Sequence, residues 1–290
     1  MVERKHHSVA IPTFVCTEPF QAGETVTLGE DEAHHIRVLR LEVGQTVRLL
    51  DGHGTRGQGV LVRLAKRHAA VRVESAATSE PPPSVHLMLP IADRDRMLWL
   101  AEKATELAAT SWRPVMWKRS KSVSPRGEGP TFQQKAQARM AGALEQSRGA
   151  WLPAMYPDAT LERAIAAAPD GPRLVLDRAG EPIGDLVSGA VAMAKEHGAG
   201  RLRPLTLAIG PEGGIEDSEM ELLKAAGFRA VSLVHTNLRF ETAAVAALAV
   251  VRSALAALPG TIRGSLEERE EREEREAREE KEEREENPDV

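Results

Sequence analysis

Residues 205–214 read Leu-Thr-Leu-Ala-Ile-Gly-Pro-Glu-Gly-Gly, an apolar run that ends directly in a glycine-rich loop. The apolar part is typical of a strand buried on both faces. Three glycines remove side chains where this strand would leave the carboxyl edge of a sheet, the place where ligands of open α/β sheets bind. The loop lacks the patterns of phosphate-binding and dinucleotide-binding loops. It therefore predicts a binding site of another kind, with a tight turn that exposes Glu212 as the alternative.

The segments around this loop predict an α/β fold. Short apolar strands alternate with helices along residues 84–262, as expected of a mostly parallel sheet covered on both faces. Strands are predicted at residues 85–89, 115–117, 174–176, 205–209 and 231–234. Helices are predicted at residues 97–109, 133–147, 218–226 and 242–258. Ser218 and Glu221 have the spacing of a capping box at the start of the third helix, and Gly227 would end it.

Residues 12–80 show a different pattern, that of short strands and tight turns. Val47 and Leu49 alternate with polar neighbours, and a turn at residues 51–54 follows. One short helix is expected at residues 34–39. We interpret this segment as a small β-barrel-like domain. The Ser-Glu-Pro-Pro-Pro run at residues 79–83 predicts an extended, semi-rigid linker to the α/β domain.

The two ends of the chain lack the periodic apolar residues that indicate a packed core. Residues 1–11 are expected to be disordered, and residues 263–290 repeat Glu-Glu-Arg as a helical or disordered tail. Residues 265–290 contain 14 acidic and 6 basic side chains, so of the net charge of −5 the tail holds −8 and residues 1–264 hold +3. A mildly basic body is compatible with RNA binding. The absence of a membrane-length apolar run and the single Cys16 predict a cytoplasmic protein without a membrane span or metal site.

A second motif, residues 238–243, reads Leu-Arg-Phe-Glu-Thr-Ala where a strand gives way to a helix. Glu241 and Thr242 suit a helix start because acidic and hydroxyl side chains favour that position. Arg239 gains nothing from the helix dipole there. Arg239 is therefore predicted to face a substrate, with an ion pair to Glu241 as the alternative.

Two further motifs have ordinary explanations when each is taken alone. Residues 145–149, Glu-Gln-Ser-Arg-Gly, are typical of a helix end with a favourable arginine and a glycine stop. Lys103 and Glu106 are spaced i,i+3 on a helix, which predicts a surface ion pair.

Taken together, five motifs occur in one characteristic order. They are Arg37-Val-Leu-Arg40, Lys103 with Thr105-Glu-Leu107, Glu145-Gln-Ser-Arg148, Gly210-Pro-Glu-Gly-Gly214 and Leu238-Arg-Phe-Glu-Thr-Ala243. This order resembles the bacterial 16S ribosomal RNA uracil-N3 methyltransferases over roughly residues 12–262. The resemblance implies a SPOUT trefoil-knotted α/β domain preceded by a PUA-like RNA-binding β-barrel. It also implies S-adenosylmethionine as cofactor, ribosomal RNA or the small ribosomal subunit as partner, and a homodimer.

The resemblance also implies roles for particular residues. The cofactor would lie in the loops of the knot, held mainly by backbone groups, at Leu176, Ile209, Gly210, Pro211, Glu212, Gly213, Val234, Asn237 and Leu238. Arg239 would stabilise the charge that spreads onto uracil O2 and O4, and either Glu212 or Glu241 would act as the base. The residues implied for RNA backbone contacts are Arg37, Arg40, Arg48 and Arg148.

The chain departs from the family pattern just before Arg239. Family members usually have Gly, Arg and Ile where this chain has Val234, Thr236 and Asn237. The departure leaves two alternatives open. One is a SPOUT methyltransferase for transfer RNA or another ribosomal RNA position, and the other is a non-catalytic RNA-binding paralogue.

Overall fold

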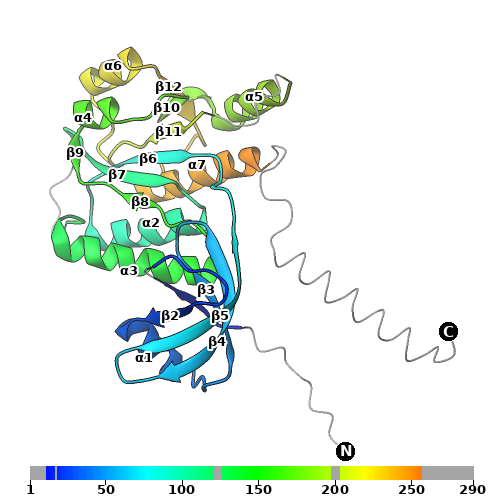
Figure 1. The fold of residues 1–290 in the computed structure, drawn as a ribbon. Helices are drawn as coiled ribbons and strands as arrows, with labels where there is room; N and C mark the ends of the chain where they lie inside the picture. The colour runs from blue at the N-terminus through cyan, green and yellow to red at the C-terminus, as the bar shows by residue number, and fades with distance from the viewer. Residues whose placement is uncertain (1–10, 17, 121–125, 197–202, 257–290) are drawn as a thin grey trace, which may run out of the picture.

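The protein is described by a computed structural model that covers residues 11–16, 18–120, 126–196 and 203–256. The N-terminal sheet lies against one side of a larger α/β domain, next to its helix α3 (Figure 1). Residues 1–10 and the predicted tail, 263–290, lie outside the described residues. No helix in the described ranges is both long and apolar enough to cross a membrane.

The N-terminal domain is a five-stranded curled sheet. Its elements are β1 (Thr13–Val15), β2 (Thr25–Leu28), α1 (Glu30–Val38), β3 (Thr46–Leu50), β4 (Thr55–Leu64) and β5 (Ala69–Thr78). The strand order is β1-β3-β4-β5-β2. Val47 and Leu49 are fully buried while Arg48 between them faces outward, which is the period-two alternation predicted from the sequence. The curled sheet fits the small barrel-like domain expected here.

The α/β domain contains seven strands and six helices within the described ranges. They are β6 (Val85–Pro90), α2 (Arg94–Glu106), β7 (Ser111–Met116), α3 (Gly129–Ser147), β8 (Ala154–Met155), β9 (Ala159–Thr160), α4 (Leu161–Ala166), β10 (Arg173–Pro182), α5 (Ile183–Glu196), β11 (Leu205–Ala208), α6 (Asp217–Ala225), β12 (Phe228–Ser232) and α7 (Phe240–Leu255). The order is β12-β10-β11-β6-β7-β8, with β9 also paired to β7, and every pair is parallel. The predicted α/β class is confirmed.

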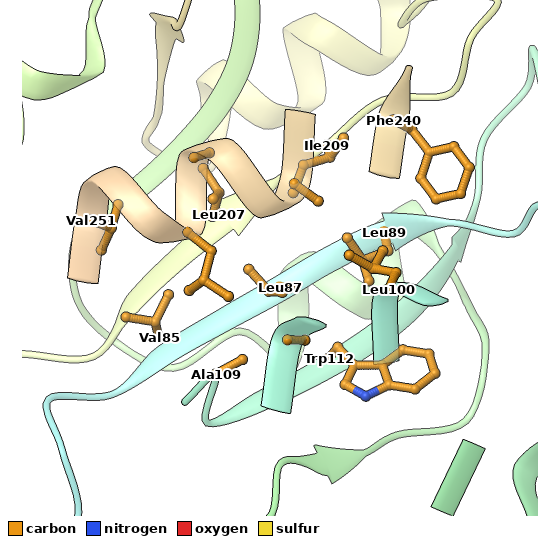
Figure 2. Packing of buried hydrophobic residues seen from close by; sticks show 14 of the residues in the cluster. Val85, Leu87, Leu89, Leu100, Ala109, Trp112, Leu207, Ile209, Phe240 and Val251 are labelled. Atoms are coloured by element: carbon orange, nitrogen blue, oxygen red, sulfur yellow. The ribbon is translucent and has the colours of Figure 1, made fainter. Parts of the chain in front are cut away.

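Helices cover both faces of this parallel sheet. On one face, α2, α3, α5 and α7 share one core cluster with alternate residues of β6, whose Leu87 and Leu89 lie in the same layer as Phe240 and Val251 of α7 (Figure 2). On the other face, α4 and α6 enclose a smaller cluster that includes Met88. Because both faces are covered, the strands read as continuous apolar runs.

Several predicted elements start or end elsewhere, and two helices, α4 and α5, were not predicted. The start of α6 corrects the predicted capping box, because the box is formed by Glu216 and Glu219 rather than by Ser218 and Glu221. Ser218 lies inside the helix, where its hydroxyl accepts a hydrogen bond from Lys118 Nζ at 2.7 Å. The helix therefore begins one residue earlier than predicted.

The two domains are joined by backbone and side-chain contacts. The β3–β4 turn docks on the segment after α3, where Gly54 N donates to Ala150 O and Leu152 N donates to Gly52 O, each at 2.8 Å. Glu145 near the end of α3 accepts a hydrogen bond from Val15 N of β1 at 3.1 Å. These contacts set the N-terminal domain against the end of α3.

A half-buried arginine ties the last described helix to the rest of the domain. Arg252 of α7 donates to the backbone carbonyls of Leu107 (3.1 Å) and Ala108 at the end of α2, and of Pro83 (2.5 Å) at the end of the predicted linker. Burial lowers the pKa of Arg252 to about 10, so the guanidinium stays charged at neutral pH. Arg252 thus satisfies carbonyls that the end of α2 leaves open.

Candidate functional site at the carboxyl edge of the sheet

A pocket of about 630 Å³ lies past the ends of β11 and β12, beside the point after Leu176 where the pairing of β10 with β12 is interrupted. Three segments surround it: residues 176–178 of β10, residues 209–215 after β11, and residues 231–240, which lead from β12 into α7. All nine residues predicted to bind the cofactor line this one pocket: Leu176, Ile209, Gly210, Pro211, Glu212, Gly213, Val234, Asn237 and Leu238. Arg239 lines it as well. Parallel strands bring these distant segments together because their carboxyl ends share one edge.

The glycine loop is shaped by contacts within the chain. A Cβ on Gly213 would lie 2.8 Å from the carbonyl oxygen of Arg119, and a Cβ on Gly210 would lie 2.5 Å from the Ile215 side chain. Gly214 has a φ of +79° and donates to Pro211 O at 2.9 Å, which closes the turn. The sequence suggested bare backbone for ligand approach. In the described structure, close packing within the chain already requires glycine at two of these positions: Gly213 lies against Arg119, and Gly210 lies against Ile215.

The segment before α7 presents Arg239 at the helix start. Arg239 is the N-cap residue of α7 and is exposed, and its side chain makes no capping hydrogen bond within the described residues. Among the described residues, no hydrogen bond or ion pair is found for its guanidinium. In the part of the chain that the structure describes, Glu241 has an ion-pair contact with Arg96 and none with Arg239, so the alternative of an Arg239–Glu241 ion pair is not what the structure shows.

Arg96 of α2 joins the two candidate carboxylates. Its Nη1 donates to Glu212 Oε1 at 2.9 Å, and its Nε lies 3.8 Å from Glu241 Oε1. The Glu241 side chain is 13% exposed, and its Oε2 is buried without a hydrogen-bond partner among the described residues. Glu212 lines the pocket and Glu241 does not. Arg96 belongs to none of the motifs recognised in the sequence and was not predicted as a site residue.

The four arginines predicted to contact RNA fall into two groups. Arg37 donates through Nη1 to the carbonyls of Ala65 and Lys66 at 3.0 and 2.6 Å, and so braces a turn of the N-terminal domain. Arg40 is exposed and has a φ of 57°. Arg48 and Arg148, from different domains, line one small cavity.

The predicted Lys103–Glu106 ion pair is confirmed. Lys103 Nζ lies 2.6 Å from Glu106 Oε1 and 2.9 Å from Glu102 Oε1. The hydrogen bond from Lys103, foremost among several causes, lowers the pKa of Glu102. These residues line a separate groove between α2 and α3 and do not reach the pocket at the sheet edge.

Comparison with known proteins identifies the family. A family model described as an RNA methyltransferase domain matches residues 79–252. The chain belongs to the RNA methyltransferase family. A second model, the RNA methyltransferase PUA domain, matches residues 28–74 within the curled sheet. The resemblance drawn from the motifs is thereby confirmed, including the small N-terminal domain that precedes the methyltransferase domain.

Relatives of this RNA methyltransferase cover most of its length. The protein named ribosomal RNA small subunit methyltransferase E from Synechocystis is 30% identical over 235 residues, 80% of this chain and 74% of the relative. The protein of the same name from Mycobacterium tuberculosis is 28% identical over 249 residues, 84% of this chain and 91% of the relative. Both domains are therefore shared with these relatives.

Solved structures agree with the family assignment. The ribosomal RNA small subunit methyltransferase E from Neisseria gonorrhoeae, solved bound to S-adenosylmethionine, has a TM-score of 0.72 and 26% identity over 84% of this chain and 97% of that one. A predicted RNA methyltransferase from Thermotoga maritima has a TM-score of 0.60 and 25% identity over 84% and 97% of the two chains. The SPOUT-type fold with its small N-terminal domain is thus that of the family.

Proposed function

We propose that this methyltransferase transfers a methyl group from S-adenosylmethionine to N3 of a uridine in 16S ribosomal RNA. The observation that carries the proposal is the single pocket lined by all nine expected cofactor residues and by Arg239. Two findings on other proteins support the proposal: relatives are named small subunit methyltransferases, and the Neisseria relative was solved with S-adenosylmethionine.

The pocket has the chemistry that an adenosine with an amino-acid arm requires. Ile209 and Leu238 offer apolar surface for a base, and the loops at residues 209–213 and 234–238 offer backbone donors and acceptors. When bound, S-adenosylmethionine supplies a methyl group on a positively charged sulfonium. We expect these two loops to be the crossing segments of a trefoil knot, as the family resemblance implies.

The residues of this chain would prepare the uridine. N3 of neutral uracil carries a proton, so a base must remove it while charge spreads onto O2 and O4. Arg239 lines the pocket and has no partner among the described residues, so its donors are available for those oxygens. We assign the base to Glu212, because its carboxylate lines the pocket. Glu241 would orient Glu212 through their shared contact with Arg96.

The reactive nitrogen also constrains the RNA. N3 lies on the pairing edge of uracil, so the target must be unpaired or flipped out of its helix when it is methylated. A docking domain that holds the neighbouring RNA would suit such a target. We assign that role to the PUA-like domain, at residues 12–80.

We further propose a cytoplasmic homodimer. Helix α5 of the same chain covers part of the apolar surface of α7. Val245 and Val250 of α7 remain only half-buried, and Trp99 of the adjacent α2 is 42% exposed. A second copy would cover them. Light scattering at micromolar protein concentration should give twice the chain mass of 31.5 kDa, and a monomer mass would contradict the dimer.

One experiment separates the proposed target from the alternatives. Nucleoside mass spectrometry of ribosomal RNA from cells with and without the gene should show one N3-methyluridine lost from 16S RNA when the gene is absent. Loss of a modified base from transfer RNA or from another ribosomal position would favour a different SPOUT specificity. Unchanged modification in every RNA would favour a non-catalytic RNA-binding protein.

A further inference from the structure

A second cavity, of about 160 Å³, lies between the N-terminal domain and the end of α3. Three arginines from separate elements line it: Arg48 of β3, Arg56 of β4, and Arg148, which follows α3. The remaining lining residues are neutral: Thr13, Leu49, Leu50, Gly57, Gln58, Ser75, Ala76 and Ala77. We call these eleven residues the arginine notch. Three arginines from separate elements that converge on one small cavity favour an anionic ligand.

Strand register explains how the notch is built. Thr13 pairs with Arg48, Arg48 with Gln58, and Gln58 with Ser75, so these four side chains form one row across the outer face of the sheet. A second row on the same face, two residues further along, joins Leu50, Arg56 and Ala77. Small side chains at positions 75 and 77 of β5 leave the space between the arginines open.

The middle row points the other way and supplies the floor. Leu49 is fully buried in the core of the N-terminal domain, and a Cβ on its partner Gly57 would meet Phe20 at 2.7 Å. The floor of the notch is therefore backbone held rigidly by the core. A rigid floor keeps the arginine side chains at a fixed spacing, which favours selective binding of an ion.

The side chain of Arg56 gives a second, independent indication that the notch binds an anion. Its Nε is buried and has no hydrogen-bond partner within the described part of the chain. A buried donor without an acceptor costs free energy, and an anion bound in the notch would supply that acceptor. Arg148 meets Arg48 and Arg56 only because its own domain docks there through the contacts of Glu145 and Ala150. The notch thus exists only when both domains are in place.

We propose that the arginine notch binds one phosphodiester of the RNA substrate, held by both domains at once. The proposal rests on the proposed function, because it assumes that RNA is the substrate. Guanidinium groups bind phosphate oxygens through paired hydrogen bonds, so the notch would fix the position of the RNA backbone without reading its sequence. The notch and the pocket at the sheet edge share no residue, so one RNA could occupy both. A phosphate held in the notch would then set the register of the RNA relative to the site of methyl transfer.

The test compares Arg56→Gln with a matched control, Arg63→Gln. Arg63 lies on the same strand, is exposed, and does not line the notch. Binding of a 16S RNA fragment is measured by fluorescence anisotropy at several salt concentrations. We expect Arg56→Gln to weaken binding about tenfold and to reduce the slope of log Kd against log salt by about one, as for one lost phosphate contact. The control should stay within about twofold of wild type.

Steady-state methylation supplies the second readout. Arg56→Gln should raise KM for RNA by a similar factor while kcat and the calorimetric affinity for S-adenosylmethionine stay unchanged. If Arg56→Gln does not fold, Arg148→Asn takes its place, because Asn tolerates the left-handed φ of 54° at that position and removes the charge. RNA binding and salt slope equal to those of the control would overturn the notch. A wild-type enzyme that neither binds nor methylates ribosomal RNA would instead overturn the proposed function.

Discussion

Arg96 and Glu212 lie 116 positions apart in the sequence, yet Arg96 Nη1 donates to Glu212 Oε1 at 2.9 Å. The same guanidinium approaches Glu241 at 3.8 Å. One arginine from α2 therefore lies between a carboxylate that lines the pocket and one that stands in the first turn of α7. The three side chains form a continuous polar contact behind the pocket.

Replacing Arg96 by alanine should slow methyl transfer by on the order of tenfold, because the Glu212 carboxylate loses the contact that orients it. The affinity for S-adenosylmethionine should change little. Arg96→Lys should retain part of the rate, since one ammonium group can hold only one of the two carboxylates well. Single-turnover kinetics measures the rate. Arg94→Ala is the control, because the one ion pair of Arg94 within the described residues is with Asp95 on the same helix, at 3.3 Å. A rate for Arg96→Ala equal to that of the control would remove Arg96 from the site.

Replacing Arg239 by alanine should lower the rate of methyl transfer by on the order of a hundredfold, as for loss of a donor to the developing anion. The melting temperature should hardly change, because the described structure gives this side chain no partner to lose. Single-turnover kinetics beside a thermal melt separates the two effects. A near-normal rate with a lowered melting temperature would show that Arg239 serves stability alone.

Replacing Gly213 by alanine should destabilise the loop by about 1–3 kcal/mol, because the new Cβ would lie 2.8 Å from the Arg119 carbonyl and force the loop to shift. Affinity for S-adenosylmethionine, measured by calorimetry, should fall together with the melting temperature. Gly142→Ala is a suitable control. A Cβ on Gly142 in α3 would meet nothing within 4 Å, so that change should stabilise the helix by up to about 1 kcal/mol. Normal cofactor affinity in Gly213→Ala would mean that the loop tolerates the shift.

Glu145 should make stability depend on pH. Burial, aided by the charge of Glu32 and opposed by the hydrogen bond from Val15 N, raises the pKa of Glu145 from 4.5 to about 7. Since the folded state holds this proton more tightly, the contribution of Glu145 is fully present below pH 4.5 and is lost as pH rises to about 7. His35, whose Nδ1 lies 3.9 Å from the carboxylate, also faces it.

Thermal melts across this pH range test the Glu145 prediction. Glu145→Gln keeps an acceptor for Val15 N and cannot ionise, so its melting temperature should fall less than that of wild type between pH 4.5 and 7. Parallel curves for the two proteins would show that Glu145 is not the group responsible.

The sequence allowed the pocket to be predicted but not the residues behind it. The apolar run at residues 205–209 and the glycines that follow carry a local signal, since a buried strand and a bare loop each have a composition of their own. Arg96 and Arg56 carry no such signal. Their roles arise from strands and helices that meet only in the folded chain, and an isolated arginine on a helix or strand is ordinarily solvated.

Local rules also misplaced the start of α6. Ser218 is the residue type expected at an N-cap, yet Glu216 holds that position because Glu219 completes its capping box and also accepts from Lys118 N at 2.8 Å. A contact from the end of β7 thus decided between two plausible starts.

The position of β11 in the sheet has a consequence for how the protein is made. β11 is the only described strand that joins β6, β7 and β8 on one side to β10 and β12 on the other. During synthesis the N-terminal domain and the first strand group leave the ribosome well before residue 205. At that stage β10 has been made and β12 has not, so the four-residue β11 must be placed between β6 and β10 before β12 can complete the sheet. Contacts between such distant segments form slowly, so we expect the cofactor pocket to be the last part of the molecule to assemble.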